Sequence, residues 1–424
     1  MPKIERLFGR EILDSRGRPT VLATCALESG VSAAASVPSG ASTGTAEAFE
    51  LRDGDLKRYE GLGCRRAAGN IGAELQDALA GRAFHDQAEF DRTMIALDGT
   101  AKKSRIGANA ILAASVAFAR AHALERGLPL YQHFADMRSV PANALPRLTI
   151  NLFSGGKHAG QQVAVQDVLI IPMSARSIDE SLVAAFDVYQ AGANLILQRY
   201  GMRLLTADEG GLAPPCHSSE EMLSLAVEAI ELAGYTPGKD VALGIDVAST
   251  HFYRDHRYHL DGEILDSAGM IGAVAQWLDR YPILSIEDGL AEDDWESWPE
   301  LRRTIAGRAL TLGDDLLCTN PSRIGRAIET SACDALLLKV NQIGTLTEAL
   351  QAYGEARASG WAVTLSVRSG ETEDNWAADL AVGWGADQFK NGSIRQSERL
   401  AKYNRLLEIE EATRWPLAGW PDRG

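Results

Sequence analysis

Two segments near the amino terminus alternate apolar and polar residues with a period of two. They cover residues 21–27 and 31–37, and the turn Glu28-Ser29-Gly30 separates them. Such alternation is typical of strands with one buried face, so we expect a β-hairpin here. A loop of very small residues follows at 38–44, and its hydroxyls and backbone donors could close over an anion. The segment 108–119 repeats its apolar residues at helical spacing and is too short to span a bilayer, which predicts a buried helix.

Beyond residue 140, short apolar runs alternate with amphipathic helices, a pattern typical of βα units around a parallel sheet. Residues 220–233 illustrate the helices, because their apolar positions fall on one helical face behind the possible caps Ser218 and Ser219. We expect strands at residues 148–151, 168–172, 242–247, 283–287, 309–314, 335–340, 362–367 and 387–390. A further candidate at 204–208 prevents the strand count from being fixed at eight.

Several of these apolar runs end in a charged residue. The residues are Asp246, Glu287, Asp314, Lys339 and Arg368. A single charge at a strand end is usually the first solvated residue. In a (β/α)₈ barrel, however, the carboxyl ends of successive strands converge on one rim, so all five charges would become neighbours. The pattern therefore predicts a charged site at that rim.

Three of these residues are carboxylates, Asp246, Glu287 and Asp314, and no histidine or cysteine ligand stands among them. A set of hard oxygen ligands is typical of a Mg²⁺ site. A divalent cation beside Lys339 would disfavour its ammonium form and make the neutral amine available as a base. Alternatively, Lys339 is only a salt-bridge partner for the carboxylates.

Composition narrows the possible functions. The chain has 424 residues and a formal net charge of −15, so it lacks the basic face that a nucleic-acid binder needs. The first ten residues contain no continuous apolar core of a signal peptide, and we expect a cytoplasmic protein without a membrane span. Five widely spaced cysteines fit reduced thiols in the core better than disulfides or a zinc site.

The chain resembles enolase from end to end. The matching motifs are Ile12-Leu13-Asp14-Ser15-Arg16-Gly17, Val37-Pro38-Ser39-Gly40-Ala41-Ser42-Thr43-Gly44, Asp208-Glu209-Gly210-Gly211, Ser285-Ile286-Glu287-Asp288, Gly313-Asp314-Asp315-Leu316, Leu338-Lys339-Val340-Asn341-Gln342 and Ser397-Glu398-Arg399-Leu400. The resemblance implies an α/β fold, in which a smaller α+β domain at residues 1–138, with a mobile loop at 37–45, precedes a modified (β/α)₈ barrel at 139–424. It also implies two Mg²⁺ ions per active site, a small anionic phospho- or phosphono-carboxylate substrate, and a homodimer or higher homo-oligomer.

The same resemblance assigns roles to individual residues. It places the first Mg²⁺ on Asp246, Glu287 and Asp314, and it makes Ser42 the ligand that arrives with the second ion when the loop closes. It makes Lys339 the base that removes a proton from carbon. Lys390 would stabilise the substrate oxygens that gain negative charge, and Glu209 would protonate the departing hydroxide. Arg368 and Ser369 would bind the phosphoryl group, and His158 and Gln166 would also lie in the site. Because Glu209 must be protonated when it acts, we expect burial and neighbouring carboxylates to raise its pKa.

Two residues inside this site depart from the family pattern. Asp167 stands where the family has glutamate, and Val367 stands where it has a histidine near the leaving hydroxyl. Both changes affect departure of hydroxide, and valine can neither donate nor accept a hydrogen bond. Smaller departures include Thr250-His251 where the family has Ser-Glu.

These departures favour a lyase that removes water from an analogue of 2-phosphoglycerate, such as 2-phosphonoformylglycerate. The enolase-like paralogue that such chemistry suggests is carboxyphosphonoenolpyruvate synthase of phosphonate antibiotic biosynthesis. One alternative is a housekeeping enolase that converts 2-phosphoglycerate to phosphoenolpyruvate in glycolysis. Another is a non-catalytic ligand-binding or scaffold protein.

Overall fold

A small antiparallel sheet opens the chain in the computed structural model, which describes residues 1–41, 43–201 and 205–421. Its strands are β1 (Ile4–Leu13), β2 (Pro19–Leu27) and β3 (Ser32–Ser36), in the order β1-β2-β3. The predicted hairpin is therefore confirmed as β2 and β3. Strand β1 was not predicted, because its charged residues interrupt the alternation and it buries only part of one face.

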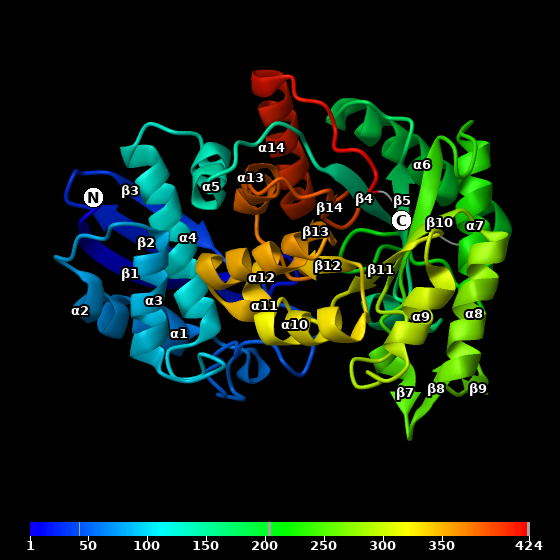
Figure 1. The fold of residues 1–424 in the computed structure, drawn as a ribbon, viewed down its shortest axis with the longest axis horizontal. Helices are drawn as coiled ribbons and strands as arrows, with labels where there is room; N and C mark the ends of the chain where they lie inside the picture. Colours follow the sequence, from blue (N-terminus) through cyan, green and yellow to red (C-terminus); the bar gives the residue numbers. More distant parts are fainter. Residues whose placement is uncertain (42, 202–204, 422–424) are drawn as a thin grey trace.

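Helices pack on one face of this sheet (Figure 1). Those that contact the sheet are α1 (Arg65–Asn70), α2 (Gln76–Leu79) and α4 (Ala108–Glu125), with a π-helical turn at Ile71–Leu75. Helices α3 (Gln87–Asp98) and α5 (Leu130–Arg138) pack against α4, and a 3₁₀ turn lies at Tyr59–Gly61. Helix α4 contains the apolar segment 108–119 and lies against β2 and β3. Every residue of that segment is buried, which confirms the predicted core helix.

Eight strands close into a barrel. They are β4 (Arg147–Ser154), β5 (Asp167–Pro172), β6 (Val241–Asp246), β10 (Ile283–Glu287), β11 (Leu310–Gly313), β12 (Ala335–Leu338), β13 (Ala362–Ser366) and β14 (Gln388–Lys390). In the extra candidate at 204–208, Thr206 forms an isolated bridge to Leu212, and residue 204 lies outside the described residues. The closed barrel thus settles the count at eight.

Strand β5 departs from the expected parallel arrangement. It pairs antiparallel with β4 and with β6, whereas the other neighbouring strands of the barrel are parallel. Its first residue, Asp167, therefore lies opposite Asp246, the last residue of β6. The reversal brings the start of β5 to the rim where the parallel strands end.

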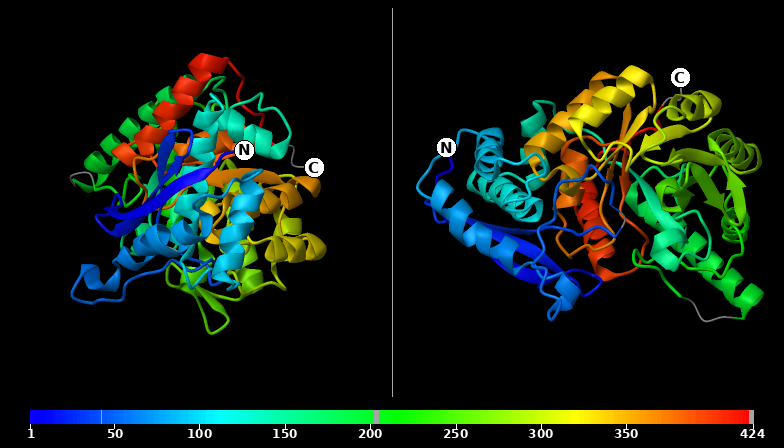
Figure 2. Two further views of the ribbon diagram at one scale, coloured as in Figure 1. Left: turned by 90° about the vertical axis from the view of Figure 1, so that its left-hand side faces the viewer. Right: turned by 90° about the horizontal axis from the view of Figure 1, so that it is seen from below.

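Helices surround the barrel (Figure 2). They are α6 (Ile178–Tyr200), α7 (Ser219–Leu232), α8 (Ser267–Arg280), α9 (Trp298–Ile305), α10 (Pro321–Thr330), α11 (Val340–Ile343), α12 (Leu346–Ala358), α13 (Trp376–Gly383) and α14 (Ser397–Thr413). A small sheet of β7 (Tyr253–Arg254), β8 (Arg257–Leu260) and β9 (Glu263–Leu265) projects beyond the barrel, and 3₁₀ turns lie at Gly156–Ala159 and Ser249–Phe252. Helix α7 begins as predicted, because the Ser218 side chain accepts a hydrogen bond from the Glu221 backbone N–H.

The C-terminal segment crosses the end of the barrel where the parallel strands begin. The Ala418 N–H donates to the Leu145 carbonyl at 2.7 Å, and the Leu145 N–H donates to the Pro416 carbonyl at 2.9 Å. Trp420 packs against a small apolar cluster inside the barrel that includes Leu310 and Ala335. This end of the barrel is therefore covered by the chain itself.

All five cysteines are buried and free, which confirms the prediction of core thiols. No helix among the described residues is both long enough and apolar enough to cross a membrane.

Candidate active site

The charged strand ends lie together at one rim of the barrel. Asp246, Glu287 and Lys390 are the last residues of β6, β10 and β14, while Asp314 and Lys339 directly follow β11 and β12. All of them are buried or nearly so. Burial of so many charges demands that they pair with one another, and the pairing pattern reveals the architecture of the site.

Lys390 occupies the centre of one charged group. Its Nζ donates to Asp246 Oδ2 at 3.0 Å and to the two oxygens of Glu287 at 2.8 and 2.7 Å. Burial raises the pKa of Asp246, but Lys390 and Lys339 outweigh it and lower that pKa to about 2. Burial lowers the pKa of Lys390, but the carboxylates of Asp246 and Glu287 raise it well above its ordinary value. Lys390 is therefore an ammonium group in contact with two carboxylate side chains.

Lys339 pairs with a different carboxylate. Its Nζ donates to Asp314 Oδ2, and Gln342 Nε2 donates to Asp314 Oδ1 at 2.8 Å. Burial lowers the pKa of Lys339, but Asp314 outweighs it and the pKa is raised. Lys339 is thus an ammonium group here, as in the salt-bridge alternative that the sequence left open. That Lys339 becomes a neutral amine when a divalent cation binds Asp314 stays a prediction.

The predicted Mg²⁺ ligands supply suitable atoms but do not form one tight group. Among the described residues, ligand atoms within 4.8 Å of one another occur in the groups His158–Asp167–Glu209 and Asp288–Asp314–Asp315. Asp288 accepts the backbone N–H groups of Asp314 and Asp315 at 2.9 and 2.8 Å, so its carboxylate is engaged in shaping that turn.

The donor set at the rim nevertheless fits a hard cation. Asp246 and Glu287 already surround the ammonium of Lys390, a cation between oxygen ligands. Asp314 has an oxygen bound to Lys339. Carboxylates are the ligands that Mg²⁺ prefers. These residues therefore suit Mg²⁺ by chemistry, with Lys339 and Lys390 as the groups that it would compete with.

A second charged group lies on the side of β4 and β5. The Asp167 carboxylate accepts from Ser154 Oγ at 2.6 Å and contacts His158 Nδ1 at 2.9 Å. The other ring nitrogen, His158 Nε2, lies 3.9 Å from Glu209 Oε1, and Asn151 Nδ2 donates to Glu209 Oε2 at 3.2 Å. His158 thus stands between the two carboxylates. Asp167 holds the histidine, and the histidine faces Glu209.

The turn that carries Glu209 depends on glycine. Gly210 has φ +83°, in the left-handed region that side chains disfavour, and its N–H donates to the Ala207 carbonyl at 2.9 Å. A Cβ on Gly211 would lie 2.6 Å from Ser154 Oγ. Both glycines therefore let the Glu209 backbone approach β4 closely.

The protonation of this group differs from the expectation for Glu209. Burial lowers the pKa of His158, but Asp167 and Glu209 outweigh it and raise that pKa to about 9. Burial raises the pKa of Glu209, but His158 and Arg399 outweigh it, so the pKa lies below its ordinary value. The predicted raised pKa of Glu209 is therefore wrong for this structure, because its nearest charged partner is a histidine cation. The proton resides on His158.

Arg368 follows β13 and is held on several sides. It donates to both oxygens of Glu47 and, through Nη1, to Asn341 Oδ1 at 3.0 Å. Arg399 donates to the backbone carbonyls of Arg368 and Ser369 at 2.8 and 2.7 Å. These bonds fix the guanidinium at the rim, where the sequence expects it.

The other predicted residues also take definite places. Gln166 Nε2 donates to Asp246 Oδ2 at 3.1 Å, and the hydroxyl of Ser369 accepts from Arg16 Nη1 at 3.2 Å. Val367 is buried between Ser366 and Arg368, and its N–H donates to the Lys390 carbonyl at 3.2 Å. Ser42 lies outside the described residues.

Sequence reasoning missed several polar partners of this site. Glu47, Asn341, Gln342, Asn151 and Ser154 each contact a predicted site residue, but none was assigned a role. Asn341 and Gln342 belong to the Lys339 motif, so their proximity in the chain was an available signal. Glu47 contacts a residue 321 positions away, for which local pattern gives no signal.

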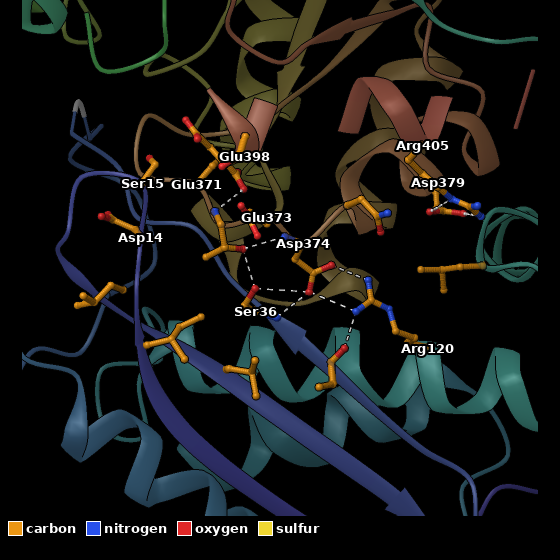
Figure 3. A pocket seen from close by; sticks show the side chains of 18 of the residues that line it. Asp14, Ser15, Ser36, Arg120, Glu371, Glu373, Asp374, Asp379, Glu398 and Arg405 are labelled. Carbon is orange, nitrogen blue, oxygen red and sulfur yellow. Dashed lines mark hydrogen bonds and ion pairs between the residues drawn. The ribbon is translucent and has the colours of Figure 1, made fainter. Parts of the chain in front are cut away.

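A sizeable cavity of the described structure lies away from this rim. It measures about 1000 Å³ and lies where the first domain meets the segment 371–379 and α14. Figure 3 shows its charged side chains paired across the cavity wall, Arg120 with Asp374 and Arg405 with Asp379. None of the predicted site residues lines it. Converging charge, rather than cavity size, therefore locates the candidate site.

Comparison with known families agrees with this architecture. Residues 4–134 match the family model described as the enolase N-terminal domain, and residues 142–415 match the one described as the enolase C-terminal TIM barrel domain. The two matches follow one another along nearly the whole chain and coincide with the antiparallel sheet and the closed barrel. The chain therefore belongs to the enolase family.

Proposed function

We propose that this protein is a Mg²⁺-dependent hydro-lyase of the enolase type that acts on an analogue of 2-phosphoglycerate. The observation that carries the proposal is the rim itself, where Lys339, Lys390 and three carboxylates face the Asp167–His158–Glu209 group. A base on one side and a proton donor on the other are what removal of water across a carbon–carbon bond requires.

Lys339 is the proposed base and removes the proton from the carbon next to the substrate carboxylate. Two Mg²⁺ ions, with Asp246, Glu287, Asp314 and Ser42 as their proposed ligands, would neutralise the carboxylate charge and lower the pKa of Lys339. Lys390, fixed between Asp246 and Glu287, presents positive charge where the substrate oxygens gain negative charge. Gln166 orients Asp246 through its amide.

The departing hydroxide needs a proton, and the His158–Glu209 pair supplies it in this proposal. His158 carries a proton at neutral pH, because its pKa is about 9. Its Nε2 lies 3.9 Å from Glu209, so a small movement would let the two share that proton. Asp167 keeps the imidazole in place from the opposite ring nitrogen.

Choice of substrate rests on which parts of the site retain the family pattern. Arg368 and Ser369, the proposed phosphoryl-binding pair, retain it, and so do the proposed metal ligands. The changes at Asp167 and Val367 instead concern the side of the leaving hydroxyl. A phosphonoformyl ester of glycerate keeps an anion for Arg368 and a carboxylate for the metals, so it is the proposed analogue. The housekeeping alternative draws on the retained base and acid, Lys339 and Glu209.

Comparing two substrates tests this proposal. We expect kcat/KM for 2-phosphonoformylglycerate to exceed that for 2-phosphoglycerate by about 100-fold, as loss of an acid–base partner would cause. Formation of the enol ester is followed by ultraviolet absorbance with Mg²⁺, and again after addition of a chelator, which should abolish turnover. A preference for 2-phosphoglycerate would establish the housekeeping enolase instead. Binding of both compounds without turnover of either would establish a non-catalytic protein.

We also propose that the chain assembles as a homodimer, as enolases usually do. Light scattering coupled to gel filtration would give a mass near twice that of the 45.6 kDa chain.

A further inference from the structure

The Glu47 carboxylate is bound to the guanidinium of Arg368, the group that the proposed function assigns to the phosphoryl group of the substrate. Arg368 Nη1 donates to Glu47 Oε2 at 2.9 Å, and Nη2 donates to Oε1 at 3.1 Å. The side chains of Arg368 and Glu47 are only 3% and 10% exposed. The pair is therefore a two-pronged, largely desolvated ion pair, the strongest geometry available to these groups.

Backbone contacts of the loop, rather than the side chain alone, place Glu47 there. Ser39 and Gly370 exchange backbone hydrogen bonds of 2.8 and 3.0 Å, and the Ala48 N–H donates to the Gln342 carbonyl at 2.7 Å. Within the loop, the Gly44 N–H donates to Glu47 Oε1 at 3.1 Å. These contacts hold the loop of the N-terminal domain over the rim on both sides of Glu47.

A second acid secures the same loop without touching Arg368. Glu292 accepts the N–H and the hydroxyl of Thr45 at 3.0 and 3.1 Å. The loop therefore has two carboxylate contacts that can be separated experimentally. The Glu47 contact engages the proposed phosphoryl-binding arginine, whereas the Glu292 contact only fastens the loop.

A carboxylate and a phosphoryl group present the same pair of oxygens to the two Nη groups of an arginine. Both cannot hold these two groups in that geometry at once. We propose that Glu47 is an internal ligand of the phosphoryl site, and that the phosphoryl or phosphonyl group of the substrate binds by displacing it from Arg368. This inference rests on the proposed role of Arg368.

An internal ligand has a quantitative signature. It reduces the apparent affinity of every anion that must displace it by one common factor, which depends only on how strongly Glu47 holds Arg368. The factor is the same for anions of different shape. If Glu47 merely oriented Arg368, its replacement would have the opposite effect on affinity, because anion binding would become weaker.

Titration calorimetry of the full chain with two probes, inorganic phosphate and phosphonoformate, tests the inference. We expect Glu47→Gln, which preserves shape and removes the charge, to lower the dissociation constants of both probes by about tenfold and by the same factor. The matched control Glu292→Gln should leave both constants within about twofold of the original. Arg368→Met should abolish binding of both probes, both in the otherwise unaltered protein and in the Glu47→Gln variant.

Weaker or unchanged binding of the two probes by Glu47→Gln would overturn the inference, and so would tighter binding by Glu292→Gln to the same degree. Absence of probe binding to the unaltered protein would also overturn it, since Arg368 would then not be an anion site. These titrations need no turnover. Failure of the proposed function, seen as absence of lyase activity on both substrates, is therefore distinguished from failure of this inference.

Discussion

Replacing Lys339 by alanine should lower turnover of the preferred substrate by about 10³-fold, the scale of a lost general base. The proton on the carbon next to a carboxylate is weakly acidic, and among the described rim residues Lys339 is the proposed proton acceptor. The initial rate of enol ester formation measures the loss. Exchange of that carbon-bound proton with deuterated solvent, followed by magnetic resonance, should fall equally, because it reports proton removal alone.

A matched control separates this effect from general damage. Lys239 is exposed and lies just before β6 begins, at the opposite end of the barrel, so Lys239→Ala should keep its rate within about twofold. Lys339→Ala leaves Asp314 without its cation, so thermal unfolding of the variant is recorded as well. A folded Lys339→Ala protein that exchanges the proton at the original rate would rule out the assigned role.

Restoring the two family residues together should raise activity on 2-phosphoglycerate by about 100-fold. The variant is Val367→His with Asp167→Glu. Histidine at 367 returns a side chain that can donate a proton near the leaving hydroxyl. Glutamate at 167 restores the family's longer side chain by adding one methylene to the carboxylate that now contacts His158. The measurement is kcat/KM for 2-phosphoglycerate.

The single variants serve as controls for the double variant. The two residues belong to one proton-transfer group. The fold-increase in kcat/KM of the double variant should therefore be much larger than the product of the fold-increases of the two single variants. Activity on 2-phosphonoformylglycerate should not rise. If the double variant gains nothing on 2-phosphoglycerate although it folds, the two departures do not determine the substrate.

Much of the architecture could be predicted from local pattern. The hairpin and α4 follow from clear periodicity, and the rim follows from charges at the ends of apolar runs. Strand β1 was missed because charged residues such as Glu5 and Arg6 break its alternation while it still pairs along β2. Apolar runs carry no information about strand direction, so the reversal of β5 was also beyond reach.

The finer chemistry of the site depends on contacts between distant residues. The Asp167–His158–Glu209 group arises from the reversed β5 and from a glycine-dependent turn. It places the proton on His158, whereas the sequence led us to expect it on Glu209. Likewise, Glu47 and Arg368 come from different domains. The charge state of a buried group depends on its nearest partner, which only the folded chain identifies.

The C-terminal segment that crosses the far end of the barrel has a consequence for access to the proposed active site. Beside Trp420 the barrel interior contains a cavity of about 20 Å³, room for a water molecule but not for a glycerate ester. A passage along the barrel axis is therefore too narrow for such a molecule. In the proposed function, reactant and product would both pass through the rim, beneath the loop that carries Glu47. In the proposed reaction, the product must therefore leave through the opening by which the next reactant enters, so we expect the product to be a competitive inhibitor.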